Sequence, residues 1–256
     1  MRNDLRGKVV LITGGTRGIG RAMGLAFGKL GAICALTHKW GSADENELRR
    51  SYANCGAPEP ILIEADAARD QDTQTLLTTL REHHAGIDIF ISNVAFADVT
   101  ASPAQYTRRG LLASIEYTAW PLVAYTEKIR DIFGAPPKYV IGLSSIGPDR
   151  YIANYDMIAC SKAVLETLAR YLAHHYASAG TRVNVVRAGI VRTESLEATL
   201  GGQKLEAIRS DRPDAFMTTD EIAHSVVALC SGWMDAVTGQ VITVDRGQAF
   251  SHGAGF

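Results

Sequence analysis

Short apolar runs alternate with longer helical stretches along the whole chain. The runs are continuously apolar, as expected of strands whose two faces are both covered by helices. Strand–helix alternation predicts a doubly wound α/β fold in which helices flank a seven-stranded parallel sheet. The predicted strands are Lys8–Thr13, Ala32–Thr37, Ile61–Ala65, Ile87–Ser92, Tyr139–Ser144, Arg182–Arg187 and Gln240–Val244.

No repeat, low-complexity tract or Pro/Gly-rich linker divides the sequence, so we expect residues 1–256 to form a single domain. The stretch from Thr218 to Glu221 has the pattern of a capping box, which predicts that the last long helix begins there. Residues 194–213 are polar, include Gly201-Gly202 and interrupt the alternation. This segment is the predicted lid over a substrate.

Composition narrows the class of protein. Hydrophobic residues make up 46% of the 256 residues, enough for a full core, and the net charge of −1 carries no nucleic-acid signature. No apolar run approaches the ~18 residues that span a membrane, and the N-terminus enters a predicted strand almost at once, unlike a signal peptide. The cysteines lack metal-ligand spacing and suit a reducing compartment: Cys34, Cys55, Cys160 and Cys230. We therefore expect a cytoplasmic protein without a metal, a membrane or a nucleic acid as partner.

A glycine-rich turn follows the first predicted strand. Its G-x-x-x-G-x-G spacing lets the backbone turn tightly and approach a pyrophosphate, whose charge the next helix N-terminus favours. The predicted cradle comprises Gly14, Thr16, Arg17, Gly18, Ile19 and Gly20. Its position after the first strand of the alternation predicts a dinucleotide site rather than a plain turn.

The chain resembles the short-chain dehydrogenase/reductase family over residues 7–247. The matching segments are TGGTRGIG, Asp66, Ser92-Asn93-Val94-Ala95, Ser145, Lys162, Arg182-Val183-Asn184, Gly239-Gln240 and Asp245-Arg246-Gly247. Within the family, SSIG…RYIANY…SKAVLETLARYLA is most similar to the NADPH-dependent enoyl-acyl-carrier-protein reductases of bacterial fatty-acid synthesis, and nearest to their third type. The resemblance implies a Rossmann fold and a homotetramer.

The resemblance also implies the cofactor contacts. NAD enzymes usually carry an acid at the end of the second strand, but the matching position here is His38, followed by Lys39, with Arg17 in the glycine turn. These cations suit the 2′-phosphate of NADPH. The remaining expected cofactor residues are Asp66 and Ala67 at the adenine, Lys162 at the nicotinamide ribose, Val191 and Thr193 at the carboxamide, and Asn93.

The spacing of the tyrosine and lysine bears on the reaction. Most family members place the tyrosine four residues before the lysine, where this chain has Ile158, whereas Tyr155 lies seven before Lys162. On a helix both positions share a face, and the shift moves the tyrosine by ~4.5 Å along the axis. In conjugate reduction the oxygen that gains charge lies two carbons further from the carbon receiving hydride, so the spacing suits an enoyl thioester. Tyr155 is the expected acid, Lys162 its activating cation and Ser145 a second donor to the substrate oxygen.

Two features depart from the family pattern. The asparagine of its usual proton relay falls near Glu116, and Arg187 precedes Ala188-Gly189 where Pro-Gly is usual. Tyr151 is a competing tyrosine. The predicted function is NADPH-dependent reduction of an enoyl thioester carried by acyl carrier protein or coenzyme A, in fatty-acid or specialised acyl biosynthesis. A ketoreductase or alcohol dehydrogenase, and a catalytically silent NADPH-sensing protein, remain as alternatives.

Overall fold

One parallel sheet holds all seven predicted strands, in the order β3-β2-β1-β4-β5-β6-β7. The structure is a computed structural model that describes residues 5–39, 44–96, 99–100, 102–194, 196, 202, 206, 210 and 216–248. The strands are β1 (Val9–Ile12), β2 (Ile33–His38), β3 (Ile61–Glu64), β4 (Ile89–Ser92), β5 (Tyr139–Ser145), β6 (Arg182–Ala188) and β7 (Val241–Val244). The predicted doubly wound Rossmann fold is confirmed.

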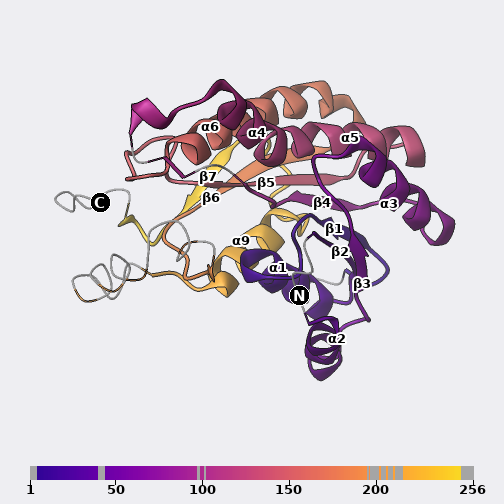
Figure 1. The fold of residues 1–256 in the computed structure, drawn as a ribbon. Coiled ribbons are helices and arrows are strands. Elements are labelled where there is room, and N and C mark those ends of the chain that lie inside the picture. The colour runs from indigo at the N-terminus through magenta and orange to yellow at the C-terminus, as the bar shows by residue number, and fades with distance from the viewer. Residues whose placement is uncertain are drawn as a thin grey trace.

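Helices cover both faces of the sheet (Figure 1). The helices α1 and α9 lie on one face, and α3, α4, α5 and α6 lie on the other, with α2 beside α1. Their bounds are α1 (Gly18–Lys29), α2 (Glu45–Asn54), α3 (Asp70–His83), α4 (Arg108–Thr118), α5 (Trp120–Phe133), α6 (Asp156–His175) and α9 (Thr219–Leu229), with 3-10 turns at Pro103–Gln105 and Ala177–Ala179. None of the helices in the described ranges is long and apolar enough to cross a bilayer.

The continuous apolar runs are explained by burial on both sides. In β1, Val10 and Ile12 pack into the core shared with α1 and α9, whereas Val9 and Leu11 pack into the core shared with α3, α5 and α6. Successive side chains of a strand point to opposite faces, so two apolar cores require apolar residues at every position. The last long helix begins as predicted, because Thr218 and Glu221 form both bonds of a capping box.

The strand order reverses between β1 and β4. In open α/β sheets, ligands bind at the carboxyl ends of strands beside such a switch point. The glycine turn follows β1 and Asn93 follows β4, so the topology brings both to this crevice.

Candidate active site

The glycine turn has the geometry of a diphosphate cradle. Gly14 and Gly18 have φ of +63° and +50°, in the left-handed region that favours glycine. A Cβ added to Gly20 would lie 2.2 Å from the Gly14 carbonyl oxygen, so only glycine fits there. Arg17, the N-cap of α1, makes no side-chain capping bond within the described residues, and the first turn of α1 carries no acid. The backbone N–H groups at the start of α1 are thus suited to bind phosphate.

Asn93 fixes the shape of this turn from across the switch point. Its side-chain amide donates to the carbonyl oxygens of Thr13 and Gly14, each at 3.0 Å. Its backbone N–H donates to Thr13 Oγ1 at 3.0 Å. The side chain expected to contact the cofactor therefore also holds the cradle.

The segment after β6 reaches back to the glycine turn. A Cβ built on Gly18 would lie 3.5 Å from Thr193 Cγ2, and Arg17 lies 3.6 Å from the Glu194 carboxylate. The buried Val191 pairs with Met217 in a parallel bridge. The structure thus brings Thr193 to the cradle, while most of the predicted lid, 194–213, lies outside the described residues and stays a prediction.

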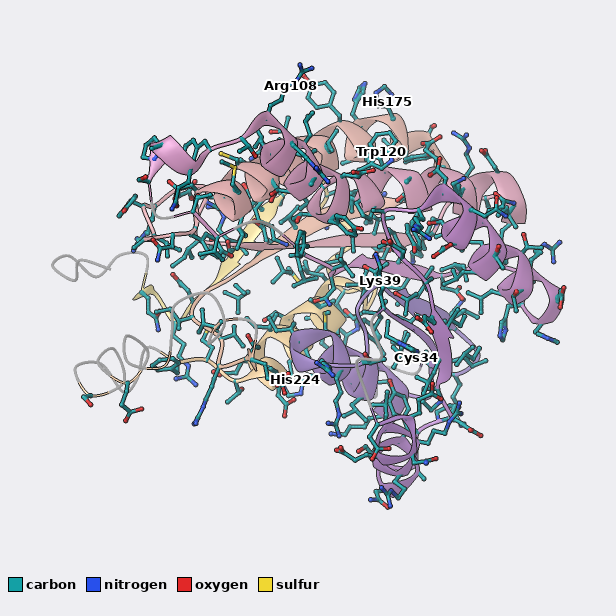
Figure 2. All side chains as sticks on the ribbon, in the orientation of Figure 1. Cys34, Lys39, Arg108, Trp120, His175 and His224 are labelled. Atoms are coloured by element: carbon teal, nitrogen blue, oxygen red, sulfur yellow. The ribbon has the colours of Figure 1, made fainter. Side chains whose placement is uncertain are left out.

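A polar cluster occupies the corner expected to bind the adenosine end. Lys39, which follows β2 between the two helical layers in Figure 2, donates to the Asp66 carboxylate and to the Tyr117 hydroxyl, the latter at 3.2 Å. Tyr117 in turn donates to Asp66 at 3.3 Å. Burial acts to raise the pKa of Asp66, but the Lys39 ammonium, the Ala68 N–H and the Tyr117 hydroxyl together hold that pKa below its usual value. The sequence predicted Lys39 and Asp66 as separate contacts and missed both their pairing and Tyr117.

The other side chain expected at the phosphate, His38, also lies near a carboxylate. His38 Nε2 is 3.8 Å from Glu45, while His38 Nδ1 is buried without a hydrogen-bond partner in the described structure. Two further expected cofactor residues are buried: Ala67, which follows Asp66, and Thr16, which precedes Arg17. The Ile19 side chain packs against the core under α1.

Tyr155 and Ser145 meet at the carboxyl end of β5. The Tyr155 hydroxyl donates to Ser145 Oγ at 3.1 Å. Burial raises the pKa of Tyr155, and the hydrogen bond to Ser145 opposes part of that rise. Ser145 Oγ also accepts from the Gly147 N–H at 3.4 Å, so among the described residues it serves as an acceptor and can direct its own hydrogen toward a ligand.

The backbone of Gly147 supports the Tyr155 ring. A Cβ added to Gly147 would lie 2.7 Å from both Cδ1 and Cε1 of that ring. This contact is not among those predicted from the sequence, although a glycine two residues after Ser145 is a signal of close approach. Tyr155 is also the N-cap of α6, with φ of −111° and ψ of 7°. The preceding Asn154 has φ of +64°, and the Tyr155 carbonyl oxygen accepts from the Ala159 N–H at 2.8 Å. The helix therefore begins just after Tyr155, and the expectation that Tyr155 and Lys162 share one face stays a prediction.

Lys162 is buried in the second turn of α6, with 5% of its surface exposed. Its ammonium donates to the Leu143 carbonyl oxygen of β5 at 2.6 Å. Burial lowers the pKa of Lys162 from 10.5 to about 8, and the negative charge of Glu166 partly opposes this. The lysine thus keeps its charge near neutral pH, while its activation of Tyr155 stays a prediction for the cofactor-bound protein.

Several candidates lie away from this centre. Tyr151 is 75% exposed, and Glu116 is exposed on α4, whose buried polar side chains are Ser114 and Thr118. Arg108 and His175 project from the outer surface of the helical layer (Figure 2). Among the described residues, no group of three His, Cys, Asp or Glu side chains is placed to hold a metal ion.

Comparison with known proteins agrees with this geometry. The family model described as enoyl-(acyl carrier protein) reductase matches residues 14–249. The chain is 30% identical over 209 residues to the enoyl-[acyl-carrier-protein] reductase [NADH] FabI of Enterococcus faecalis, covering 79% of this chain and 83% of that protein. The crystal structure of the enoyl-[acyl-carrier-protein] reductase (NADH) of Aquifex aeolicus superposes with a TM-score of 0.84 at 27% identity, covering 98% of this chain and 99% of the other.

A third similar structure bears on the fold alone. The Bacillus cereus enoyl-acyl carrier protein reductase, solved with NADP+ and an indole naphthyridinone, superposes with a TM-score of 0.85 at 24% identity, covering 97% of this chain and 99% of that one. The matched family model and the Enterococcus relative each extend over most of the chain. The chain therefore belongs to the enoyl-(acyl carrier protein) reductase family of short-chain, nicotinamide-dependent oxidoreductases.

Proposed function

We propose that this protein reduces the C=C bond of an α,β-unsaturated acyl thioester with NADPH. The acyl group is carried by acyl carrier protein or coenzyme A, and the pathway is fatty-acid or specialised acyl biosynthesis. The observation that carries this proposal is the pairing of the Tyr155 hydroxyl with Ser145 at 3.1 Å, with Tyr155 rather than residue 158 in that place. The names of the similar proteins, which include enoyl-acyl-carrier-protein reductases, support it.

The chain's own residues act on the thioester oxygen. A bound nicotinamide would supply the hydride for Cβ of the substrate. Negative charge then collects on the thioester oxygen, where the hydroxyls of Tyr155 and Ser145 can both donate hydrogen bonds. The enolate then takes up a proton from water at Cα, which restores the carbonyl and leaves the saturated acyl thioester. Lys162 keeps a positive charge at neutral pH. In the cofactor-bound protein we expect that charge to favour the anionic state of the substrate and of the phenol.

The choice of NADPH rests on the charges at the end of β2. Lys39 and Arg17 are the cations of this corner, with His38 beside Lys39. No carboxylate occupies position 38 or 39, where an NAD enzyme usually holds the ribose hydroxyls. The Enterococcus and Aquifex relatives are named for NADH, whereas the Bacillus structure contains NADP+. The nicotinamide cofactor in these names thus differs among the similar proteins, and the local cations favour NADPH here.

The reaction is tested with two substrates and two matched variants. Cofactor oxidation is followed with a crotonyl thioester and with an acetoacetyl thioester, using the wild type, Tyr155→Phe and Tyr151→Phe. We expect turnover of the crotonyl substrate, a loss of about 10²–10⁴-fold in Tyr155→Phe and little change in Tyr151→Phe. If Tyr151→Phe alone is inactive, the assignment of Tyr155 as the acid is refuted. If the wild type reduces only the acetoacetyl thioester, the protein is a ketoreductase. If it reduces neither substrate, the result favours an NADPH-sensing protein.

The cofactor is tested by fluorescence titration with NADPH and NADH. One charge-assisted contact to the 2′-phosphate contributes roughly 1.5–3 kcal/mol, or ~10- to 100-fold in affinity. Lys39→Ala should reduce this preference, whereas Lys8→Ala, which removes a lysine paired with Asp88 at the start of β1, should not. Equal affinity of the wild type for both cofactors would exclude the NADPH proposal. The expected homotetramer is checked on the same samples by analytical ultracentrifugation.

A further inference from the structure

A buried arginine joins three parts of the active-site end of the sheet. Arg187 is 8% exposed, at the carboxyl end of β6. Its Nε and Nη2 donate to the two oxygens of Glu166 on α6, at 3.0 and 2.6 Å, and its Nη1 donates to Asp149. The Ser144 hydroxyl of β5 donates to the same Glu166 carboxylate at 2.6 Å. The family resemblance assigns no role to this arginine.

Asp149 belongs to the segment 146–155, which connects Ser145 to Tyr155. The Asp149 N–H donates to the Ile146 carbonyl oxygen at 3.2 Å, which closes a tight turn around Gly147. That turn supports the Tyr155 ring, because the ring lies against Gly147. Asp149 is therefore connected to the phenol through one turn of backbone.

We infer that Arg187 is a positioning residue for Tyr155, anchored on Glu166 and acting through Asp149. This inference rests on the proposed role of Tyr155 as the acid. A bidentate arginine–carboxylate pair fixes orientation as well as distance, so the Arg187–Glu166 pair gives Nη1 a fixed place relative to β5 and α6. Asp149 then holds the connecting segment at that place, and the phenol stays within reach of Ser145.

The two arms of Arg187 differ in what they contribute to stability. The Glu166 arm is buried on both sides, and removing one partner would leave an unpaired charge in the core. The Asp149 side chain is 61% exposed, and an exposed carboxylate contributes little to folding. A substitution of Asp149 therefore cuts the link to Tyr155 and leaves the fold intact, whereas Arg187→Met risks unfolding and is not a clean test.

The experiment compares Asp149→Ala and Asp149→Asn with Asp131→Ala. Asp131 is a matched control, because its side chain is 63% exposed and also pairs with an arginine, on the helix α5. The measurements are kcat with the enoyl thioester, the Kd for NADPH, the melting temperature, and hydrogen exchange of residues 146–155 in the free protein. Asp149→Ala should lower kcat about tenfold, as expected for a small misplacement of a catalytic group, and should speed exchange in 146–155. The Kd and melting temperature should match those of Asp131→Ala, and Asp149→Asn, which keeps an acceptor oxygen, should recover part of kcat.

Two results would overturn the inference. Wild-type kcat and exchange in Asp149→Ala would mean that Arg187 only neutralises Glu166. A loss of kcat without faster exchange in 146–155 would mean that Asp149 acts on the substrate rather than on the segment. If the wild type does not reduce enoyl thioesters, the proposed function fails, but the exchange comparison still decides whether Arg187 holds the segment.

Discussion

The buried charge of Lys162 gives a prediction about stability as well as catalysis. Burial lowers the pKa of this lysine to about 8, against 10.5 for the exposed side chain. The unfolded chain therefore holds the proton more tightly than the folded chain does. Below about pH 8 both states are protonated, and the folded state bears the full cost of an ammonium group in the core. As the pH rises through 8 toward 10.5, the folded state loses its proton first and that cost disappears.

The magnitude follows from the difference between the two pKa values. A difference of 10.5 − 8, or about 2.5 units, corresponds to about 3 kcal/mol at low pH. Because Lys162 is almost fully buried, this figure needs no large reduction for solvent screening. Between pH of about 6.5 and about 9.5, the wild type should gain about 2 kcal/mol of unfolding free energy from this group alone.

The assay is a double difference between the wild type and Lys162→Met. Urea unfolding of both proteins without cofactor is measured at the two pH values, so that titration of the other groups cancels. The variant also lacks the hydrogen bond from Lys162 to the Leu143 carbonyl oxygen. That loss shifts the variant's unfolding free energy by the same amount at both pH values, so it cancels in the double difference. A difference between the two proteins that stays constant within about 0.5 kcal/mol across this range would refute the lowered pKa. If the unfolding free energy of the wild type minus that of the variant falls as the pH rises, the pKa of Lys162 is raised rather than lowered in the folded state.

Three further substitutions test the geometry of the site and the fold. Gly147→Ala places a Cβ 2.7 Å from the Tyr155 ring and should lower kcat about tenfold or more without changing the Kd for NADPH; unchanged kcat would show that the ring position is not critical. Gly20→Ala places a Cβ 2.2 Å from the Gly14 oxygen and should weaken NADPH binding at least about tenfold in a fluorescence titration, so unaltered binding would contradict the cradle. Thr218→Ala removes the cap of α9 and should cost about 1 kcal/mol in urea unfolding with kcat intact.

The elements that the sequence predicts well are those encoded locally. The strands follow from continuous apolar runs, and β1 shows why, since its neighbouring side chains enter two different cores. The glycine turn is equally local, because Gly14, Gly18 and Gly20 lie within seven residues. The capping box at Thr218 needs only four residues. Each of these features is set by neighbours in sequence, so spacing alone identifies it.

The contacts missed by the sequence analysis depend on register and on helix rotation. Lys39 reaches Asp66 because β2 and β3 pair with His38 opposite Glu64, which aligns the residues that follow both strands. Tyr117 enters the same cluster while its neighbour Glu116 is exposed, since one residue turns the side-chain direction by about 100° on a helix. The family's asparagine aligns near Glu116, so the alignment misses the side chain that makes the polar contact, Tyr117, by a single position. The N-cap place of Tyr155 was missed for a similar reason, because it depends on the left-handed Asn154.

Each side chain expected to bind the 2′-phosphate lies near a carboxylate, and this limits how strongly the protein can prefer NADPH. Arg17 lies near Glu194 and His38 near Glu45, and both of these carboxylates are at least half exposed. A 2′-phosphate can replace such solvated partners at small cost. The Asp66 carboxylate is buried, so moving Lys39 away would remove a direct cationic partner and leave the longer contact with Arg69 at 3.7 Å. Lys39 can therefore contribute to NADPH binding only if its ammonium contacts the phosphate while it stays on Asp66. The contribution of Lys39 should consequently appear as a smaller change in the NADPH/NADH ratio in Lys39→Ala than a lysine without such a partner would give. Binding of both cofactors should also weaken, because Asp66 loses its lysine and keeps Tyr117, Arg69 and the Ala68 N–H.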